Sequence, residues 1–118
     1  METIQAIVDN LLLELRRGTL VLSVLSQLQT PRYGYSLVEH LKEKDVEIEP
    51  GTLYPLLRRL EKQGLLQSEW EISGSKPRKY YVLSDRGLQV LALLRIQWFE
   101  MKETIDALMR EGDTDYGR

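Results

Sequence analysis

The chain contains no cysteine among its 118 residues, which excludes a disulfide framework and thiolate chemistry. Long hydrophobic runs are also missing, and none approaches the ~20 apolar residues that a membrane span requires. The N-terminus reads Met1-Glu2-Thr3, without the basic segment that begins a secretory signal peptide. These absences lead us to expect a cytoplasmic protein with no membrane partner.

Residues that commonly perform chemistry are scarce. The single histidine, His40, has no cysteine and no acidic partner at ligand spacing, so we expect no metal and no cofactor, and we interpret His40 as a solvated helix position. Ser23 and Ser26 have no candidate base nearby in the sequence. There is no glycine-rich phosphate loop and no paired-carboxylate cleft. The sequence therefore argues against an enzyme.

The charge is distributed unevenly along the chain. The formal net charge of −2 argues by itself against a nucleic-acid binder. Residues 50–87, however, hold seven basic and four acidic residues, which leaves +3 there and −5 in the rest of the chain. Because a DNA-binding surface is a local patch and not a bulk property, this segment is a candidate.

The N-terminal region is expected to form two helices. Residues 3–15 form the first, with Thr3 as a plausible cap. Its apolar stripe has helical spacing and consists of Ile4, Ile7, Val8, Leu11, Leu12 and Leu15. The run Arg16-Arg17-Gly18 breaks this pattern, so we expect a second, heavily buried helix from about residue 19 to 28.

Two more helices are predicted in the middle of the chain, over residues 34–44 and 52–63. A turn at Thr30-Pro31-Arg32 precedes the first of them, and a polar loop over 45–50 separates the two. Gly64 then provides the C-terminal stop. The leucines of the second helix, at positions 53, 56, 57 and 60, are expected to face inward.

A hairpin and a long helix complete the chain. Alternation over residues 65–72 and β-branched and aromatic residues over 78–83 predict two strands, joined by a turn at 73–77. Ser84 is a good N-cap for a helix over 85–111, which contains no proline.

This order of elements predicts a fold that is mainly α with a small β-hairpin. We interpret it as a winged helix-turn-helix with an N-terminal helix and a long C-terminal dimerisation helix. The expected divisions are residues 1–16 for the N-terminal helix, 17–84 for the winged helix-turn-helix domain, 85–111 for the dimerisation helix and 112–118 for a flexible tail.

The helix over 52–63 is the candidate recognition helix. With its leucines inward, the residues left outward are Thr52, Tyr54, Pro55, Arg58, Arg59 and Lys62. Recognition helices read the major groove mainly with their N-terminal residues, where Gly51 and Thr52 would let the backbone come close. Tyr54 could reach a phosphate or a base edge. The alternative is an ordinary solvated helix face.

The hairpin tip carries three cations within four residues, Lys76, Arg78 and Lys79. A wing needs such cations to follow the phosphate backbone or the minor groove. The alternative is an ordinary edge hairpin protected by lysine. If the three bind phosphates, loss of each should flatten the salt dependence of DNA binding by about one unit.

The last helix contains a heptad seam spaced 3, 4, 3, 4, 3, namely Leu91, Leu94, Trp98, Met101, Ile105 and Leu108. Residues 85–111 span about 40 Å at 1.5 Å per residue, whereas a body of residues 18–87 is only about 28 Å across. The seam therefore needs another partner, and a second copy is the simplest. The alternative is that the seam folds back on the N-terminal helix of the same chain.

Trp98 and Phe99 lie together in the middle of this helix. They could form an aromatic wall for a flat apolar ligand at a dimer interface. They could equally be core residues, and the sequence leaves both interpretations open.

Several segments resemble the PadR family of bacterial transcription regulators. The runs GTLYPLLRRLEKQGLL (residues 51–66) and PRKYYVLSDRG (77–87) closely resemble that family's signatures. RGTL (17–20) and YGYSL (33–37) are similar to its first two helix openings, and Tyr33 joins the predicted DNA-binding residues. Ser84 stands where the family more often has threonine, and both residues can cap a helix.

The resemblance implies a homodimer that binds double-stranded DNA at pseudo-palindromic operators, usually as a repressor. It also implies that Ile4, Ile7 and Leu11 pack on the partner's last helix. Some short members with one C-terminal helix bind planar aromatic compounds between these helices, near a tryptophan, and Trp98 is the matching residue here. The rival hypothesis is a winged helix used for protein–protein contact, which the net charge of −2 favours and the basic wing opposes.

Overall fold

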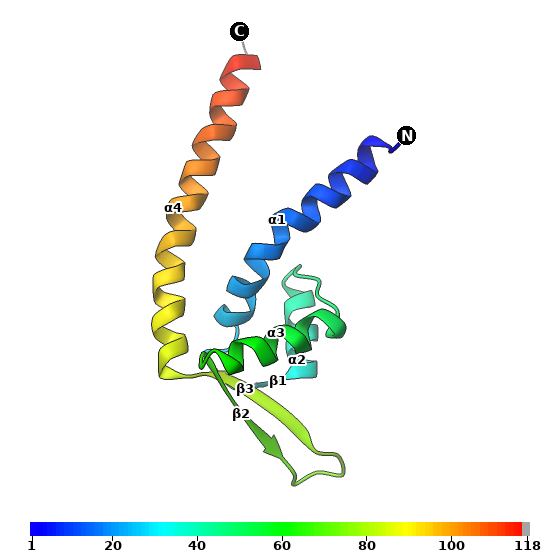
Figure 1. Cartoon of the computed structure of the whole chain (residues 1–118), viewed down its shortest axis with the longest axis vertical. Helices are drawn as coiled ribbons and strands as arrows, with labels where there is room; N and C mark the ends of the chain where they lie inside the picture. The colour runs from blue at the N-terminus through cyan, green and yellow to red at the C-terminus, as the bar shows by residue number, and fades with distance from the viewer. Residues whose placement is uncertain (117–118) are drawn as a thin grey trace.

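Two long helices extend from a small body of shorter helices and strands (Figure 1). The computed structural model describes residues 1–116, with side chains described as far as Glu111. In order, the elements are α1 (Ile4–Ser26), β1 (Arg32–Tyr33), α2 (Gly34–Glu43), α3 (Pro50–Lys62), β2 (Leu66–Glu71), β3 (Arg78–Leu83) and α4 (Asp85–Tyr116). The hairpin of β2 and β3 projects at the end opposite the free ends of α1 and α4. The predicted fold class, mainly helical with a small hairpin, is confirmed.

Helix α1 is one continuous helix of 23 residues, so the predicted break at Arg16-Arg17-Gly18 is wrong. A glycine costs a helix only about 1 kcal/mol relative to alanine, and the two arginines favour helix. The Thr19 hydroxyl also donates to the carbonyl of Arg16 (2.9 Å). The expected division between residues 16 and 17 therefore falls inside one continuous helix.

The core lies between the C-terminal part of α1, helices α2 and α3, the base of the sheet and the start of α4. Its members are almost all leucine: Val24, Leu25, Leu28, Leu37, Leu41, Ile48, Leu53, Leu57, Leu60, Leu66, Tyr81, Leu83 and Leu91. Each fully buried leucine contributes about 1.5–3 kcal/mol of hydrophobic free energy. Leu56, which was expected to face inward, is only half-buried.

The sheet has three antiparallel strands in the order β1-β3-β2. Strands β2 and β3 pair from Leu66 opposite Leu83 to Glu71 opposite Arg78. Arg32 was predicted to lie in a turn, but it begins β1 and pairs with Tyr81. The turn prediction fails here because the open edge of β3 offers backbone groups with which Arg32 and Tyr33 can pair.

The ends of the helices follow the predicted caps. The Thr3 side chain accepts a hydrogen bond from the amide of Ala6 at the start of α1 (3.0 Å). Gly64 has a φ of +81° directly after α3, a conformation that favours glycine. The Ser84 hydroxyl donates to the carbonyl of Gly64 (2.6 Å) and accepts from the amide of Gly87 (3.0 Å). Ser84 therefore joins the end of α3 to the start of α4.

Helix α4 continues beyond residue 111 as far as Tyr116. We expected residues 112–118 to be a flexible tail, of which 117–118 lie outside the described residues. No proline interrupts the extra turn, and each added residue propagates the helix by one hydrogen bond. Within the described part of the chain, no helix is long and apolar enough to cross a membrane.

Candidate nucleic-acid interface

Helix α3 presents a basic face to solvent. Leu53, Leu57 and Leu60 are buried on its inner side, and the exposed residues are Gly51, Thr52, Pro55, Arg58, Arg59 and Lys62. None of the three cations in that set forms an ion pair with a described residue. This face can therefore attract phosphate with three uncompensated charges.

Tyr54 is placed differently from the other residues of the candidate recognition helix. It is half-buried, and its ring packs on the backbone of Gly34, where α2 begins. A Cβ atom added to Gly34 would lie 2.6 Å from Tyr54 Cε1 and 2.9 Å from its hydroxyl oxygen. The ring therefore sets the contact between α2 and α3, the two helices of the helix-turn-helix.

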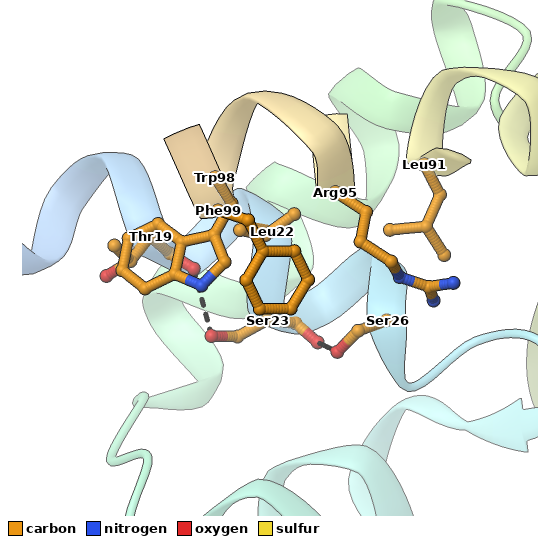
Figure 2. Close-up of a pocket in the computed structure, with 8 residues that line it drawn as sticks. All are labelled: Thr19, Leu22, Ser23, Ser26, Leu91, Arg95, Trp98 and Phe99. Atoms are coloured by element: carbon orange, nitrogen blue, oxygen red, sulfur yellow. Dashed lines mark hydrogen bonds between the residues drawn. The ribbon is translucent and has the colours of Figure 1, made fainter. Parts of the chain in front are cut away.

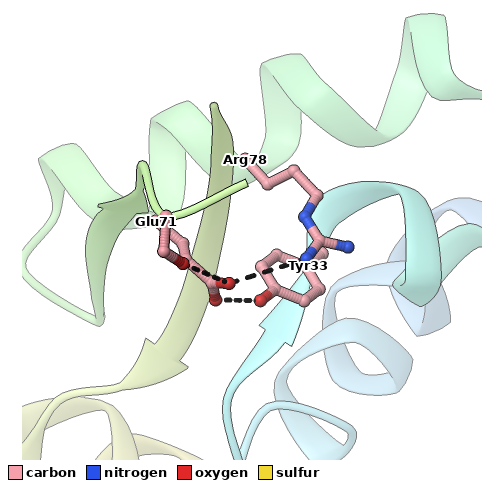
Figure 3. A network of polar contacts seen from close by, with 4 residues as sticks. Tyr33, Glu71 and Arg78 are labelled. Carbon is pink, nitrogen blue, oxygen red and sulfur yellow. Dashed lines mark hydrogen bonds and ion pairs between the residues drawn. The ribbon is translucent and has the colours of Figure 1, made fainter. Parts of the chain in front are cut away.

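Tyr33, at the boundary of β1 and α2, is bound to the wing, which is the β2–β3 hairpin (Figure 3). Its hydroxyl donates to the carboxylate of Glu71. Arg78 Nη2 lies 3.6 Å from Glu71 Oε1, and the Arg78 guanidinium lies 4.3 Å from the centre of the Tyr33 ring. The hydrogen bond raises the pKa of Tyr33 and lowers the pKa of Glu71. Tyr33 and Arg78 thus form one network with Glu71.

Lys79 contacts α3 across the hairpin. Its Nζ lies 3.6 Å from Glu61 Oε1, and the Ser68 hydroxyl donates to the same carboxylate. The ammonium also lies over the rings of Trp70 (5.8 Å) and Tyr81 (5.4 Å). Lys76, at the exposed wing tip, forms no ion pair with any described residue. The three wing cations therefore differ in whether a nearby carboxylate neutralises their charge.

The carboxylates of Glu61 and Glu71 were missed when the wing was interpreted from the sequence. Glu71 stands directly opposite Arg78 in the hairpin register. Opposite residues of an antiparallel pair are side-chain neighbours, but the turn predicted over 73–77 would have placed Ile72, one residue further along, opposite Arg78. No local pattern in the sequence could reveal the role of Glu61, because its contact with Lys79 joins helix α3 to strand β3.

A pocket of about 310 Å³ lies between α1 and α4 (Figure 2). Trp98, Phe99 and Arg95 line it from α4, and Thr19, Leu22 and Ser23 line it from α1. Trp98 is half-buried and Phe99 is exposed. The chain thus has an aromatic wall beside an open space.

The remaining predicted dimer residues form an apolar surface on the two long helices. Exposed members of the predicted set are Ile4, Ile7, Leu11, Leu94, Met101, Ile105 and Leu108. Leu91 differs, because it is only 3% exposed and belongs to the core of its own chain. Leu93, Ile96 and Met109 add further exposed apolar area to α4. Large exposed apolar patches are typical of interaction surfaces.

His40 is not the solvated residue that we expected. It is half-buried, and its Nε2 lies 2.7 Å from Gln27 Oε1. The error arises because the end of α1 packs beside α2, which a single-helix pattern does not reveal. Among the described residues, no group of three potential ligand side chains could hold a metal ion.

Helices α2 and α3 with the following β2–β3 hairpin define a winged helix-turn-helix, a class that binds DNA through its second helix and its wing. Residues 21–93 match the Transcriptional regulator PadR-like family. The chain belongs to this family, whose members are generally non-enzymatic DNA-binding regulators.

Three relatives illustrate the similarity. A PadR family transcriptional regulator of Eggerthella lenta is 54% identical, with a TM-score of 0.84 over 89% of this chain and 94% of that one. A transcriptional regulator of Mycobacterium tuberculosis is 33% identical over 79 residues, 67% of each chain. Bacillus subtilis PadR, solved in complex with operator DNA, is 28% identical, with a TM-score of 0.62 over 66% of this chain and 48% of that one.

Proposed function

We propose that this PadR family regulator acts as a homodimeric repressor that binds a pseudo-palindromic operator. The observation that carries the proposal is the basic face of α3, where Arg58, Arg59 and Lys62 are exposed and unpaired among the described residues. Gly51 and Thr52 at its N-terminal end are also exposed, which suits close approach to a groove. Residues 17–84 would form the DNA-binding unit, acting in the cytoplasm.

The apolar surface of α1 and α4 supports a symmetric dimer. Residues 4–16 of α1 and 85–111 of α4 would form the interface, with α1 of one protomer against α4 of its partner. Ile4 is 78% exposed and Ile105 52% exposed in the single chain. A second copy presents the same apolar surface, so a two-fold interface would cover both sets at once.

We also propose that a small planar hydrophobic effector relieves repression. The pocket between α1 and α4 supports this, because Trp98 and Phe99 line it and it adjoins the proposed dimer interface. An effector can change DNA affinity only if it binds one arrangement of the dimer better than the other. Quenching of Trp98 fluorescence by a planar apolar compound, measured in a Trp70→Phe background, would support the proposal. Absence of quenching with any such compound would leave Trp98 as a packing residue.

The experiment is a fluorescence-anisotropy titration of the protein against DNA from upstream of its own gene. Unrelated DNA of equal length is the control, and both are titrated at two salt concentrations. We expect tight binding to the upstream DNA alone, weakening steeply with salt. Absence of binding to either DNA at low salt would contradict the proposal and favour the rival function, a winged helix used for protein–protein contact.

A further inference from the structure

Glu61 stands out because it is an acidic residue on a helix that is otherwise basic toward solvent. It is the second-last residue of α3, and its carboxylate contacts both strands of the wing. Ser68 of β2 donates to it and Lys79 of β3 pairs with it at 3.6 Å. Among the described contacts, this is where the end of the candidate recognition helix is joined to the hairpin by side-chain polar groups.

The surroundings of Lys79 are those of an anchored side chain. Lys79 and Glu61 are only 30% and 32% exposed, whereas Arg78 in the neighbouring pair is 57% exposed. The Lys79 ammonium lies over the faces of Trp70 and Tyr81, where the ring quadrupole attracts a cation. To reach a phosphate, Lys79 would have to leave a carboxylate and two rings.

Electrostatics also argues that Lys79 is not a phosphate ligand. A cation contributes to DNA affinity mainly by neutralising a phosphate and releasing its condensed counterions. A lysine that exchanges a carboxylate for a phosphate leaves the carboxylate uncompensated beside the DNA, so little net charge is neutralised. Lys76, which is exposed and unpaired among the described residues, has no such penalty.

We propose that Glu61 is a specificity-determining residue: it holds Lys79 and Ser68 and so fixes the angle of the wing to α3. Lys79 is then a positioning residue, and Lys76 is the wing's phosphate ligand. This proposal rests on the proposed DNA-binding function. A wing held at one angle fits only DNA whose groove and backbone suit both elements together, whereas a loose wing with a freed lysine adapts to any duplex.

The test compares Glu61→Gln with Glu69→Gln in the anisotropy assay. Each variant removes one negative charge, but Glu69 accepts a hydrogen bond only from Tyr80 and pairs with no cation among the described residues. We expect Glu61→Gln to bind unrelated DNA more tightly and to lose roughly tenfold in the ratio of specific to non-specific affinity, comparable to one mismatched base pair. The ratio should change less than about threefold in Glu69→Gln. Equal effects of the two variants would overturn the proposal, since they would show a general charge effect.

Salt dependence separates the two lysines. Lys76→Gln should reduce the slope of log affinity against log salt by about 0.9 per protomer, the value for one lost phosphate contact on duplex DNA. Lys79→Gln should leave that slope unchanged while lowering the specificity ratio. A slope change in Lys79→Gln equal to that in Lys76→Gln would show that Lys79 binds phosphate and would overturn the assignment.

Hydrogen exchange keeps the proposal testable without DNA. In Glu61→Gln, amides of residues 66–83 should exchange faster than in wild type, while those of α2 and α4 keep their protection. Unchanged exchange of the wing amides would overturn the proposal that Glu61 holds the wing, even if the protein binds its operator. If wing exchange rises but no DNA binds to the wild-type protein, Glu61 does hold the wing and the proposed function fails.

Discussion

At the scale of single residues, the contact between Gly34 and Tyr54 controls how the two helices of the helix-turn-helix meet. Gly34 is buried, and any Cβ there would lie 2.6 Å from the Tyr54 ring. Such a distance is well inside van der Waals contact, so the ring must move if the site gains a methyl group.

We therefore predict that Gly34→Ala lowers the free energy of unfolding by about 1–3 kcal/mol and weakens DNA binding by displacing α3. Chemical denaturation measures the first effect and anisotropy the second. The control for the stability measurement is Gly51→Ala, because no atom lies within 4 Å of a Cβ at Gly51. A Gly34→Ala protein as stable as the Gly51→Ala protein would refute the packing argument.

The hydrogen bond between Tyr33 and Glu71 predicts a pH effect. Because the pKa of Glu71 is lowered in the folded protein, its contribution to stability is present above the ordinary value of 4.5 and is lost as pH falls through the lowered pKa. The pKa of Tyr33 is raised, so its contribution is lost only as pH rises above 10.0. Tyr33→Phe should move the pKa of Glu71 up toward 4.5, as measured by a carboxyl NMR titration.

The matched control for that titration is Tyr80→Phe. Tyr80 donates to Glu69 (2.8 Å) and not to Glu71, so removing its hydroxyl should leave the Glu71 titration nearly unchanged. If Tyr33→Phe and Tyr80→Phe shift the Glu71 curve equally, the specific role of the Tyr33 hydroxyl is wrong.

At the scale of elements, α1 shows that a helix can continue through a residue of low helix propensity, here Gly18, when helix-forming residues flank it on both sides. Gly18 is exposed, with no atom within 4 Å of where a Cβ would lie. We predict that Gly18→Ala stabilises the protein by roughly 0.5–1 kcal/mol, because alanine loses less backbone entropy in a helix. Urea denaturation monitored by circular dichroism measures this. A loss of stability would indicate that α1 bends at Gly18 in solution.

Elements with local signals could be predicted from the sequence. Thr3, Gly64 and Ser84 mark helix ends through their own hydrogen bonds or φ values. Alternation identified the first strand of the wing, and β-branched and aromatic residues identified the second. Strand β1 could not be predicted, because two residues show no period and their pairing depends on the distant strand β3. The residues of the basic α3 face were found by spacing, whereas the partners of Tyr54 and Lys79 were not, since those contacts join separate elements.

At the scale of the whole molecule, the β2–β3 hairpin and the free ends of α1 and α4 lie at opposite ends (Figure 1). A substitution in the proposed dimer interface should therefore disrupt the dimer without changing the residues proposed to contact DNA. We predict that Ile105→Glu, which puts a charge in the proposed interface, converts the protein to a monomer in sedimentation velocity and reduces operator affinity. A monomer loses one half-site contact and must order two chains on DNA independently.

The control for this substitution is Ala107→Glu. Ala107 is exposed, and residues two positions apart point to different sides of a helix, so the added charge avoids the seam that contains Ile105. Ala107→Glu should remain dimeric. Two monomeric variants, or two dimeric ones, would contradict the assigned interface.

The most direct test of the central claim is a hydroxyl-radical footprint of the wild-type protein on DNA from upstream of its gene. A symmetric dimer that inserts two copies of α3 into successive major grooves predicts two protected half-sites related by a two-fold axis. Their centres should be about 10–10.5 base pairs, or 34–36 Å, apart. Protection spread evenly along the DNA, or confined to one unsymmetric site, would contradict the account.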